Sequence, residues 1–551
     1  MKKRTALLMS AVLTLGLLAG CGGGDAQTDA AAGDGAQTAQ GDASGADGAA
    51  GSESGNAGSA EASEGVSGTS DETLTIALTS EPATLMPSPS SAKESGVVIN
   101  CMAETLVKWD SETGEILPNL ADYEWIDDTH FRVTLKEGIY FQNGEELTTE
   151  DVLYTFQVKN SFSSGGFSTL NLDATEIEDD YNMVFETNGI WVQAPERFCQ
   201  DNYTILSKKT LEAMGGTENT DLYPIEGYGT GPYTFKEWVQ GQYILLERND
   251  NYWNTENAPY YKYMKFVFVN DAAARAMAVE SGDVNVAMEL PTSQGAIYEG
   301  NDAVSVYYLD TMLTGGIYLN CDREGLNNEL VREAIWNLVD VKALNQLTGN
   351  GLGAECQTTI SPYSIVYDPV PEGTVREVNI EKAKELLAEA GYGDGLTLEM
   401  SCMAVQQPQC EIIQENLRQG GITVNLTVNE TPTHFDLLRS GNYDMDITDL
   451  SPMYYTENLR LVDGRISTDI VAGGCNYKDE NFYPLLDDAY NAFDMDERIA
   501  AYKVCQDYMK EHYVFVGTNT TVKMELVTAG LTCPGLTGTG WEDFTKVRPV
   551  Q

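Results

Sequence analysis

Residues 22–72 form a segment that cannot fold by itself, and they fix where the folded part of the chain begins. The segment is built almost entirely from Gly, Ala, Ser, Asp, Gln, Thr and Glu, and Val66 is its only apolar residue larger than alanine. Such a composition cannot bury enough apolar surface to offset the entropy lost on ordering. We therefore expect a flexible linker with an r.m.s. reach of about 40 Å, and a globular body from residue 73 onward.

The N-terminus has the layout of a secretory signal, with basic residues at positions 2–4 and an apolar run at 6–18. The run is shorter than the roughly 20 residues that span a bilayer. It ends in Leu18-Ala19-Gly20-Cys21, which resembles a bacterial lipobox, where the cysteine is diacylated and becomes the first mature residue. Two acyl chains suffice for stable anchoring. We predict a lipoprotein signal peptide at 1–20 and lipidation of Cys21, with an ordinary signal and a coincidental cysteine as the alternative.

The charge of the chain excludes one class of partner. Asp and Glu number 84 against 33 Lys and Arg, for a formal net charge of -51. Nucleic-acid binding needs the opposite sign, so no nucleic-acid partner is expected. The acidic surface is best explained as keeping an exported protein soluble, although it could also favour cationic ligands.

The cysteines indicate neither a metal site nor a disulfide framework. There are 10, and acylation of Cys21 leaves nine, an odd number that cannot all pair internally. They lack CxxC spacing, which argues against zinc. Cys402 and Cys410 are the only close pair, and we predict that they and the other thiols are buried and free rather than bridged.

Apolar periodicity indicates a mixed α/β body. Residues 73–78 form a β-rich run, and residues 131–135 alternate like a half-buried strand. Residues 396–400, 411–418 and 422–428 are predicted as strand, helix and strand, which is a βαβ unit. Further helices are predicted at 97–109, 152–158, 272–281, 330–339, 381–390 and 497–510, and a strand at 317–320.

Catalytic chemistry is poorly represented. The only histidines are His130, His434 and His512, and no HExxH, GxSxG or P-loop motif is present. We predict a surface position on a strand for His130 and a capping role at a helix start for His434. Aromatic pairs near turns, such as Tyr252-Trp253, suit a binding cleft, although most aromatic residues should seal domain surfaces. We expect no enzyme activity, no cofactor and no metal.

Several motifs in order along the chain carry a family resemblance. They are LPNLA at 117–121, LKEGIYF at 135–141, GTGPY at 229–233, RNDNYW at 248–253, VREAI at 331–335 and AKELLAEAGY at 383–392. From about residue 74 to 534 the chain resembles the family 5 solute-binding proteins of ABC importers, whose members bind oligopeptides, dipeptides, nickel chelates and other small solutes.

The resemblance implies a bilobed α/β fold of the periplasmic-binding-protein type (type II), with a hinge between the lobes and an extra subdomain. Lobe I would comprise residues 73–118, 226–320 and 522–551, the extra subdomain residues 119–225, and lobe II residues 321–521. Ligand binding would then shift an equilibrium between open and closed lobes.

In such proteins two loops line the cleft, one after the first strand and one after the strand predicted here at 443–447. In this chain the loops supply the candidate ligand-binding residues Ser90, Ser91, Asp449, Leu450, Ser451, Met453, Tyr454 and Tyr455. Peptide-binding relatives carry in the second loop a tryptophan and, three positions later, an aspartate that pairs with the peptide's α-ammonium.

Those two positions align here with Leu450 and Met453, so the aspartate is missing. We therefore expect a more hydrophobic or aromatic-stacking ligand rather than a fixed peptide specificity. A one-residue slip of the loop, with another carboxylate such as Asp449 in that role, is the alternative.

The predicted function is that of a monomeric, lipid-anchored receptor on the extracytoplasmic face of the cell membrane. It would capture a small organic solute or short peptide and deliver it to ABC permease subunits. A receptor of the same fold that senses without transport is the first alternative. An extracellular hydrolase is the second, and it lacks a nucleophile and base constellation in the sequence.

Overall fold

The computed structural model describes residues 70–86, 93–110, 115–162, 170–216, 227–369, 376–447, 459–466, 474–538 and 542–550. The predicted signal peptide, Cys21 and residues 22–69 of the predicted linker lie outside these ranges. Residues 70–72 belong to strand β1 (Ser70–Leu78), so the folded body begins three residues earlier than the sequence predicted. Within them, no helix has the length and apolar character needed to cross a membrane.

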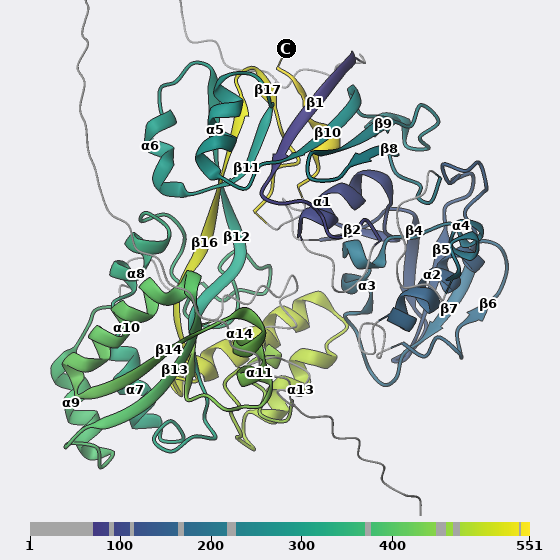
Figure 1. Cartoon of the computed structure of the whole chain (residues 1–551). Coiled ribbons are helices and arrows are strands. Elements are labelled where there is room, and N and C mark those ends of the chain that lie inside the picture. Colours follow the sequence, from purple (N-terminus) through teal and green to yellow (C-terminus); the bar gives the residue numbers. More distant parts are fainter. Residues whose placement is uncertain are drawn as a thin grey trace, which may run out of the picture. The chain divides into compact units, whose positions relative to one another are not determined.

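A ten-stranded mixed sheet organises the folded body (Figure 1), in the order β14-β13-β15-β12-β16-β11-β1-β10-β9-β8. Its strands are β1 (Ser70–Leu78), β8 (Tyr233–Val239), β9 (Tyr243–Arg248), β10 (Tyr261–Phe268), β11 (Val286–Leu290), β12 (Val304–Leu319), β13 (Leu396–Met403), β14 (Ile422–Asn429), β15 (Met445–Asp446) and β16 (Phe515–Thr528). The pairs β1/β10 and β13/β14 are parallel, whereas β12/β16 is antiparallel. The predicted mixed α/β class is confirmed.

Strands β12 and β16 join the two halves of this sheet. They pair from Val304 opposite Thr528 to Tyr318 opposite Phe515, with register shifts between Asp310 and Gly316. Next to them, β11 pairs with β16 and β15 pairs with β12. The sequence predicted only the end of β12, because its first part pairs with residues about two hundred positions away and lacks a clear local alternation.

Helix α1 spans Lys93–Met102. The prediction of a helix at 97–109 was wrong for residues 103–109, which are not helical. The chain leaves the helix after Met102, and residues Val107–Trp109 form the short strand β2. The Met102 carbonyl accepts a hydrogen bond from Gly231 N at 2.9 Å instead of continuing the helix. A Cβ atom on Gly229 would lie 2.1 Å from that same carbonyl oxygen, so glycine permits the close approach.

A second, four-stranded sheet has the order β4-β5-β7-β6. Its strands are β4 (Ala121–Trp125), β5 (His130–Leu135), β6 (Glu176–Ile177) and β7 (Asn182–Glu186), and helix α2 (Thr149–Phe162) accompanies them. An aromatic core of Phe131, Phe156, Phe185 and Phe198 packs beneath them. His130 is partly exposed and faces Glu186 across the strands, so its predicted surface position is confirmed.

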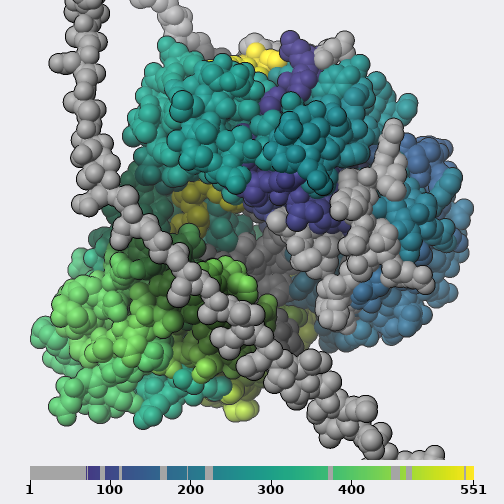
Figure 2. Space-filling model, in the orientation of Figure 1, coloured from purple at the N-terminus to yellow at the C-terminus, as the bar shows by residue number. Residues whose placement is uncertain are grey.

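The βαβ unit predicted around residues 396–428 is confirmed as β13, α10 (Gln407–Gly420) and β14. Figure 2 shows the green residues of this region as one continuous packed body. Other elements there and elsewhere are α5 (Ala272–Glu280), α7 (Glu329–Leu338), α8 (Val341–Thr348), α9 (Ile380–Glu389), α11 (Thr431–Arg439), α13 (Tyr483–Asn491) and α14 (Met495–Glu511). Shorter ones are β3 (Ile116–Pro118), α3 (Ala194–Arg197), α4 (Lys208–Ala213), α6 (Gly295–Tyr298), β17 (Leu531–Thr532) and β18 (Arg548–Pro549).

The cysteines behave as predicted. All nine in the described ranges are buried and free, including Cys402 on β13 and Cys410 on α10. Burial raises the pKa of both thiols, which keeps them protonated and unreactive.

Candidate ligand-binding site

The candidate residues from the sequence all lie outside the described residues. This holds for Ser90, Ser91, Asp449, Leu450, Ser451, Met453, Tyr454 and Tyr455, and for Cys21. Their roles therefore stay predictions. The first loop was predicted at residues 87–95, and the structure shows its last three residues, from Lys93, as the start of α1. It also describes Asp446 at the end of β15, just before the second predicted loop.

Lys93 belongs to a charged cluster, which we define as Lys93, Glu289, Lys523, Glu525 and Glu542. The Lys93 ammonium forms ion pairs with Glu289 and, at 3.2 Å, with Glu542. Lys523 lies 3.7 Å from Glu542. Glu525, on β16, is 0% exposed, and neither of its carboxyl oxygens accepts a hydrogen bond from the described part of the chain.

The electrostatics of the cluster follow from burial. Burial raises the pKa of Glu525 to about 8, and repulsion from Glu542 adds to the effect. Burial and repulsion from Lys93 lower the pKa of Lys523. Burial also disfavours the charge on Lys93, but the carboxylates of Glu542 and Glu289 outweigh it and raise the pKa. With Glu525 protonated, two ammonium groups face two carboxylates, and the cluster is electrically balanced.

Three buried polar side chains, Ser401, His434 and Asp446, lie in contact beside the start of the second predicted loop. His434 Nδ1 lies 3.0 Å from Ser401 Oγ, and His434 Nε2 lies 3.4 Å from Asp446 Oδ1. The predicted capping role of His434 is wrong, because the side chain is fully buried between α11, β13 and β15, and α11 has no side-chain cap. Burial lowers the pKa of His434, because it disfavours the charged imidazolium.

Serine, histidine and aspartate together suggest nucleophilic catalysis, but the geometry here serves a structural purpose. All three side chains are buried, and Asn429 Nδ2 donates to the Ser401 hydroxyl at 3.1 Å. A substrate has no route to a hydroxyl held in this way. The contacts bind α11 to the end of β15, from which the second predicted loop departs.

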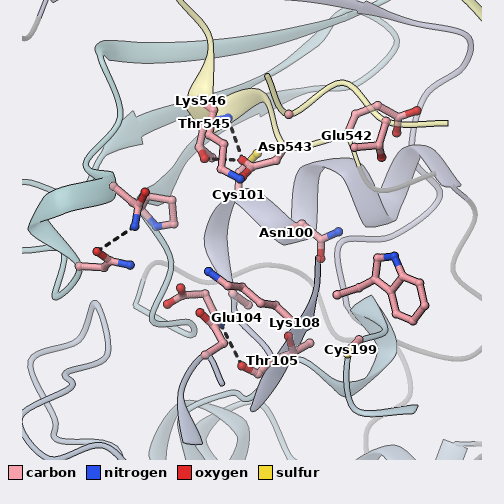
Figure 3. Close-up of a pocket in the computed structure, with 18 of the residues that line it drawn as sticks. Asn100, Cys101, Glu104, Thr105, Lys108, Cys199, Glu542, Asp543, Thr545 and Lys546 are labelled. Carbon is pink, nitrogen blue, oxygen red and sulfur yellow. Dashed lines mark hydrogen bonds and ion pairs between the residues drawn. The ribbon is translucent and has the colours of Figure 1, made fainter. Parts of the chain in front are cut away.

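A cavity of 260 Å³ lies beside the C-terminal end of α1 (Figure 3). Its lining comes mainly from residues 100–109, the turn at 252–257 and the C-terminal segments 534–537 and 542–546. In Figure 3, Asp543, Thr545 and Lys546 lie on one side of the cavity, and Glu104, Thr105 and Lys108 lie on the other.

Glu104 is the most heavily bonded carboxylate of this cavity. It accepts hydrogen bonds from Tyr252 Oη at 2.8 Å, Trp253 Nε1 at 2.8 Å and Thr230 Oγ1 at 2.9 Å. Burial raises the pKa of Glu104, and these hydrogen bonds lower it in part. Of the aromatic pair noted in the sequence, Tyr252 lines the cavity, and the polar atoms of both residues donate to Glu104.

The cavity was not predicted from the sequence. Residues 100–105 were included in a helix, and residues 542–546 showed no motif. Tyr252-Trp253 was the one signal that pointed to it, because paired aromatics near turns are unusual in a core. No group of three or more His, Cys, Asp or Glu side chains among the residues that the structure describes is placed to hold a metal ion.

The chain matches the family model of bacterial extracellular solute-binding proteins, family 5, over residues 115–461, which is more than half of its length. It belongs to this family. Family 5 comprises solute-binding proteins of ABC importers, so the predicted family, fold and general function are confirmed.

Curated relatives agree with this assignment. The solute-binding protein is 26% identical over 399 residues to the oligopeptide-binding protein AppA of Bacillus subtilis, covering 68% of this chain and 72% of AppA. It is 27% identical over 384 residues to the nickel-binding periplasmic protein of Escherichia coli, covering 62% and 68%.

Solved structures share the fold. HbpA2 from Haemophilus parasuis superposes with a TM-score of 0.76 at 21% identity, covering 87% of this chain and 100% of HbpA2. DppA from Helicobacter pylori in complex with the peptide STSA gives a TM-score of 0.71 at 22% identity, covering 87% and 98%.

Proposed function

We propose that this protein is the lipid-anchored receptor of an ABC importer, which captures a small organic solute or short peptide and delivers it to the permease. The family assignment over residues 115–461 carries the proposal. The named ligands of the relatives, an oligopeptide for AppA and nickel for the Escherichia coli protein, set the range of solutes to test first.

The sheet supports a hinge between two lobes. We propose the lobe boundaries predicted from the sequence, with the hinge at β12 and β16, whose register shifts between Asp310 and Gly316 interrupt the ladder. A ligand that binds the closed state better than the open state would shift the population toward closure. Closure would then present a joint surface of both lobes to the permease.

We further propose that Cys21 is acylated and that residues 22–69 act as the linker between lipid and receptor. No membrane-crossing helix occurs within the described ranges, and the predicted anchor needs none. The anchor would hold the receptor on the extracytoplasmic face, within about 40 Å of the membrane.

Ligand binding is tested by thermal unfolding of the mature protein with peptides, amino acids, nickel chelates and other small solutes. A true ligand at 100 times its Kd stabilises the folded state by about 2.7 kcal/mol, which raises Tm. Small-angle scattering with the same ligand should show a smaller radius of gyration. If no solute raises Tm and no compaction appears, the proposal fails.

A further inference from the structure

The carboxylates of Glu104 and Asp543, which line the cavity in Figure 3, already have partners inside the protein. Glu104 accepts from Tyr252, Trp253 and Thr230. Asp543 accepts from Thr545 N at 3.1 Å and from the Thr545 hydroxyl, and it lies 3.3 Å from Lys546 Nζ. The Glu542 side chain is fully buried in the charged cluster beside Lys93. The carboxylates of Glu104 and Asp543 are therefore engaged, whereas that of Glu542 faces ammonium groups and accepts no hydrogen bond from the described part of the chain.

Lys108 and Asn100 are two of the side chains of this cavity whose donor groups remain unused. The exposed Lys108 ammonium and the partly exposed Asn100 amide make no hydrogen bond or ion pair within the described part of the chain. In a chain with 84 acidic and 33 basic residues, carboxylate partners for a lysine are abundant. An ammonium group that lines a cavity without such a partner is available to a ligand anion.

The surroundings favour an anion of single charge. The three hydrogen bonds that Glu104 accepts from Tyr252, Trp253 and Thr230 offset part of the negative charge that a ligand would meet there. Two lysines line the cavity; Lys546 is engaged by Asp543, and the positive charge of Lys108, on the opposite side, has no carboxylate partner in the described part of the chain. A monocarboxylate balances that charge, whereas a dianion such as a phosphate would leave excess negative charge beside Asp543 and Glu104.

The walls beside Lys108 offer flat apolar area. Trp109 and Tyr252 line the cavity together with Pro232 and Pro534. Rings of this kind cover the apolar part of a solute while a few polar groups fix its orientation.

We propose that the cavity in Figure 3 binds a solute with a single carboxylate group, which forms an ion pair with Lys108 and accepts a hydrogen bond from the Asn100 amide. This inference rests on the proposed receptor function and specifies the chemical class of its ligand. It requires no α-ammonium on the ligand, which agrees with methionine at position 453.

The test uses matched pairs of solutes, each an N-acetyl amino acid or N-acetyl dipeptide and its primary amide. The acid and the amide differ in charge, and acetylation removes the ammonium group. Thermal shift and calorimetry on the full mature protein should show that at least one acid binds. Its amide should bind more weakly by on the order of tenfold or more, because a hydrogen-bonded ion pair is lost.

Three variants locate the effect. Lys108→Gln should remove the preference for the acid, whereas Lys108→Arg should keep it. Lys342→Gln is the matched control, because Lys342 is also exposed and lies on α8, away from the cavity lining. Lys108 is exposed, so unchanged Tm values without ligand are expected for all three variants.

Each remaining outcome has a definite meaning. Equal binding of acid and amide, or an acid preference that survives Lys108→Gln, overturns the carboxylate proposal. Binding and compaction with cationic or neutral solutes alone also overturns it and leaves the receptor function standing. If no solute of any charge binds, the receptor function fails and the carboxylate proposal fails with it.

Discussion

Glu525 lies on β16, the strand that runs through both halves of the large sheet, and no described residue donates a hydrogen bond to its carboxyl oxygens. An ionised carboxylate in that position would be costly, and burial raises its pKa accordingly. Lys93 stays charged in the same cluster because two carboxylates surround it. At the residue scale, the protein therefore keeps its interior neutral by holding a proton on Glu525.

The raised pKa of Glu525 predicts how the free energy of unfolding depends on pH. Below pH 4.5, the ordinary pKa of glutamate, Glu525 is protonated in both the folded and the unfolded state. Between 4.5 and about 8 only the folded state keeps the proton, so the free energy of unfolding falls as pH rises through this window. The slope from one group is up to about 1.4 kcal/mol per pH unit.

Urea unfolding at pH 5, 6.5 and 8 checks this prediction. Glu525→Gln should flatten the decline relative to the natural protein, while Glu299→Gln, at an exposed position, should leave it unchanged. Parallel curves for the natural protein and Glu525→Gln would show that the carboxyl ionises in the folded state.

At the scale of elements, the end of α1 depends on a backbone contact rather than on its own residues. Gly229 and Gly231 bring the chain against Met102 and Ala103, and the helix stops there. The same turn carries Thr230, which donates to Glu104 in the cavity. One close approach therefore sets both the helix length and a wall of the candidate site.

Replacing Gly229 with alanine tests this contact. The new Cβ would lie 2.1 Å from Met102 O, so the backbone must move. We expect a loss of about 1 to 3 kcal/mol in the free energy of unfolding. Gly393→Ala is the control, since its Cβ would meet Ala388 at an ordinary 3.4 Å. Equal stability of the two variants in chemical denaturation would contradict the proposed role.

At the scale of the whole molecule, the family assignment predicts that the folded body works outside the cytoplasm. The family is extracellular, and the predicted lipobox and residues 22–69 of the predicted linker precede the first described residue, Ser70. Anchoring would keep a receptor near its permease, so that captured solute is not lost by diffusion.

Cys21→Ala tests the anchor in cells. The natural protein should incorporate labelled palmitate and sediment with membranes, and the variant should do neither while keeping its Tm and ligand binding. Ser10→Ala, also in the predicted signal but distant from the cysteine, is the control. Sedimentation of the Cys21→Ala protein with membranes would argue against lipid anchoring.

Local patterns in the sequence were sufficient for many elements. Strand β5, helix α9 and the β13-α10-β14 unit follow from periodicity, and Gly391 after α9 adopts the positive φ expected of a helix-ending glycine. Local patterns did not predict most of β12 or the end of α1. Pairing with β16 forms the strand, and contact with Gly229 and Gly231 ends the helix, and both partners are distant in the sequence.

The sequence by itself determined the family, the α/β class and the absence of catalytic motifs, because each depends on residues close together in the chain. Only the tertiary structure decided that the charged cluster around Lys93 and Glu525 forms, that His434 is buried rather than capping, and that Lys108 lines a cavity. The physical reason is that burial and charge pairing depend on contacts between segments up to hundreds of residues apart, which local periodicity does not encode.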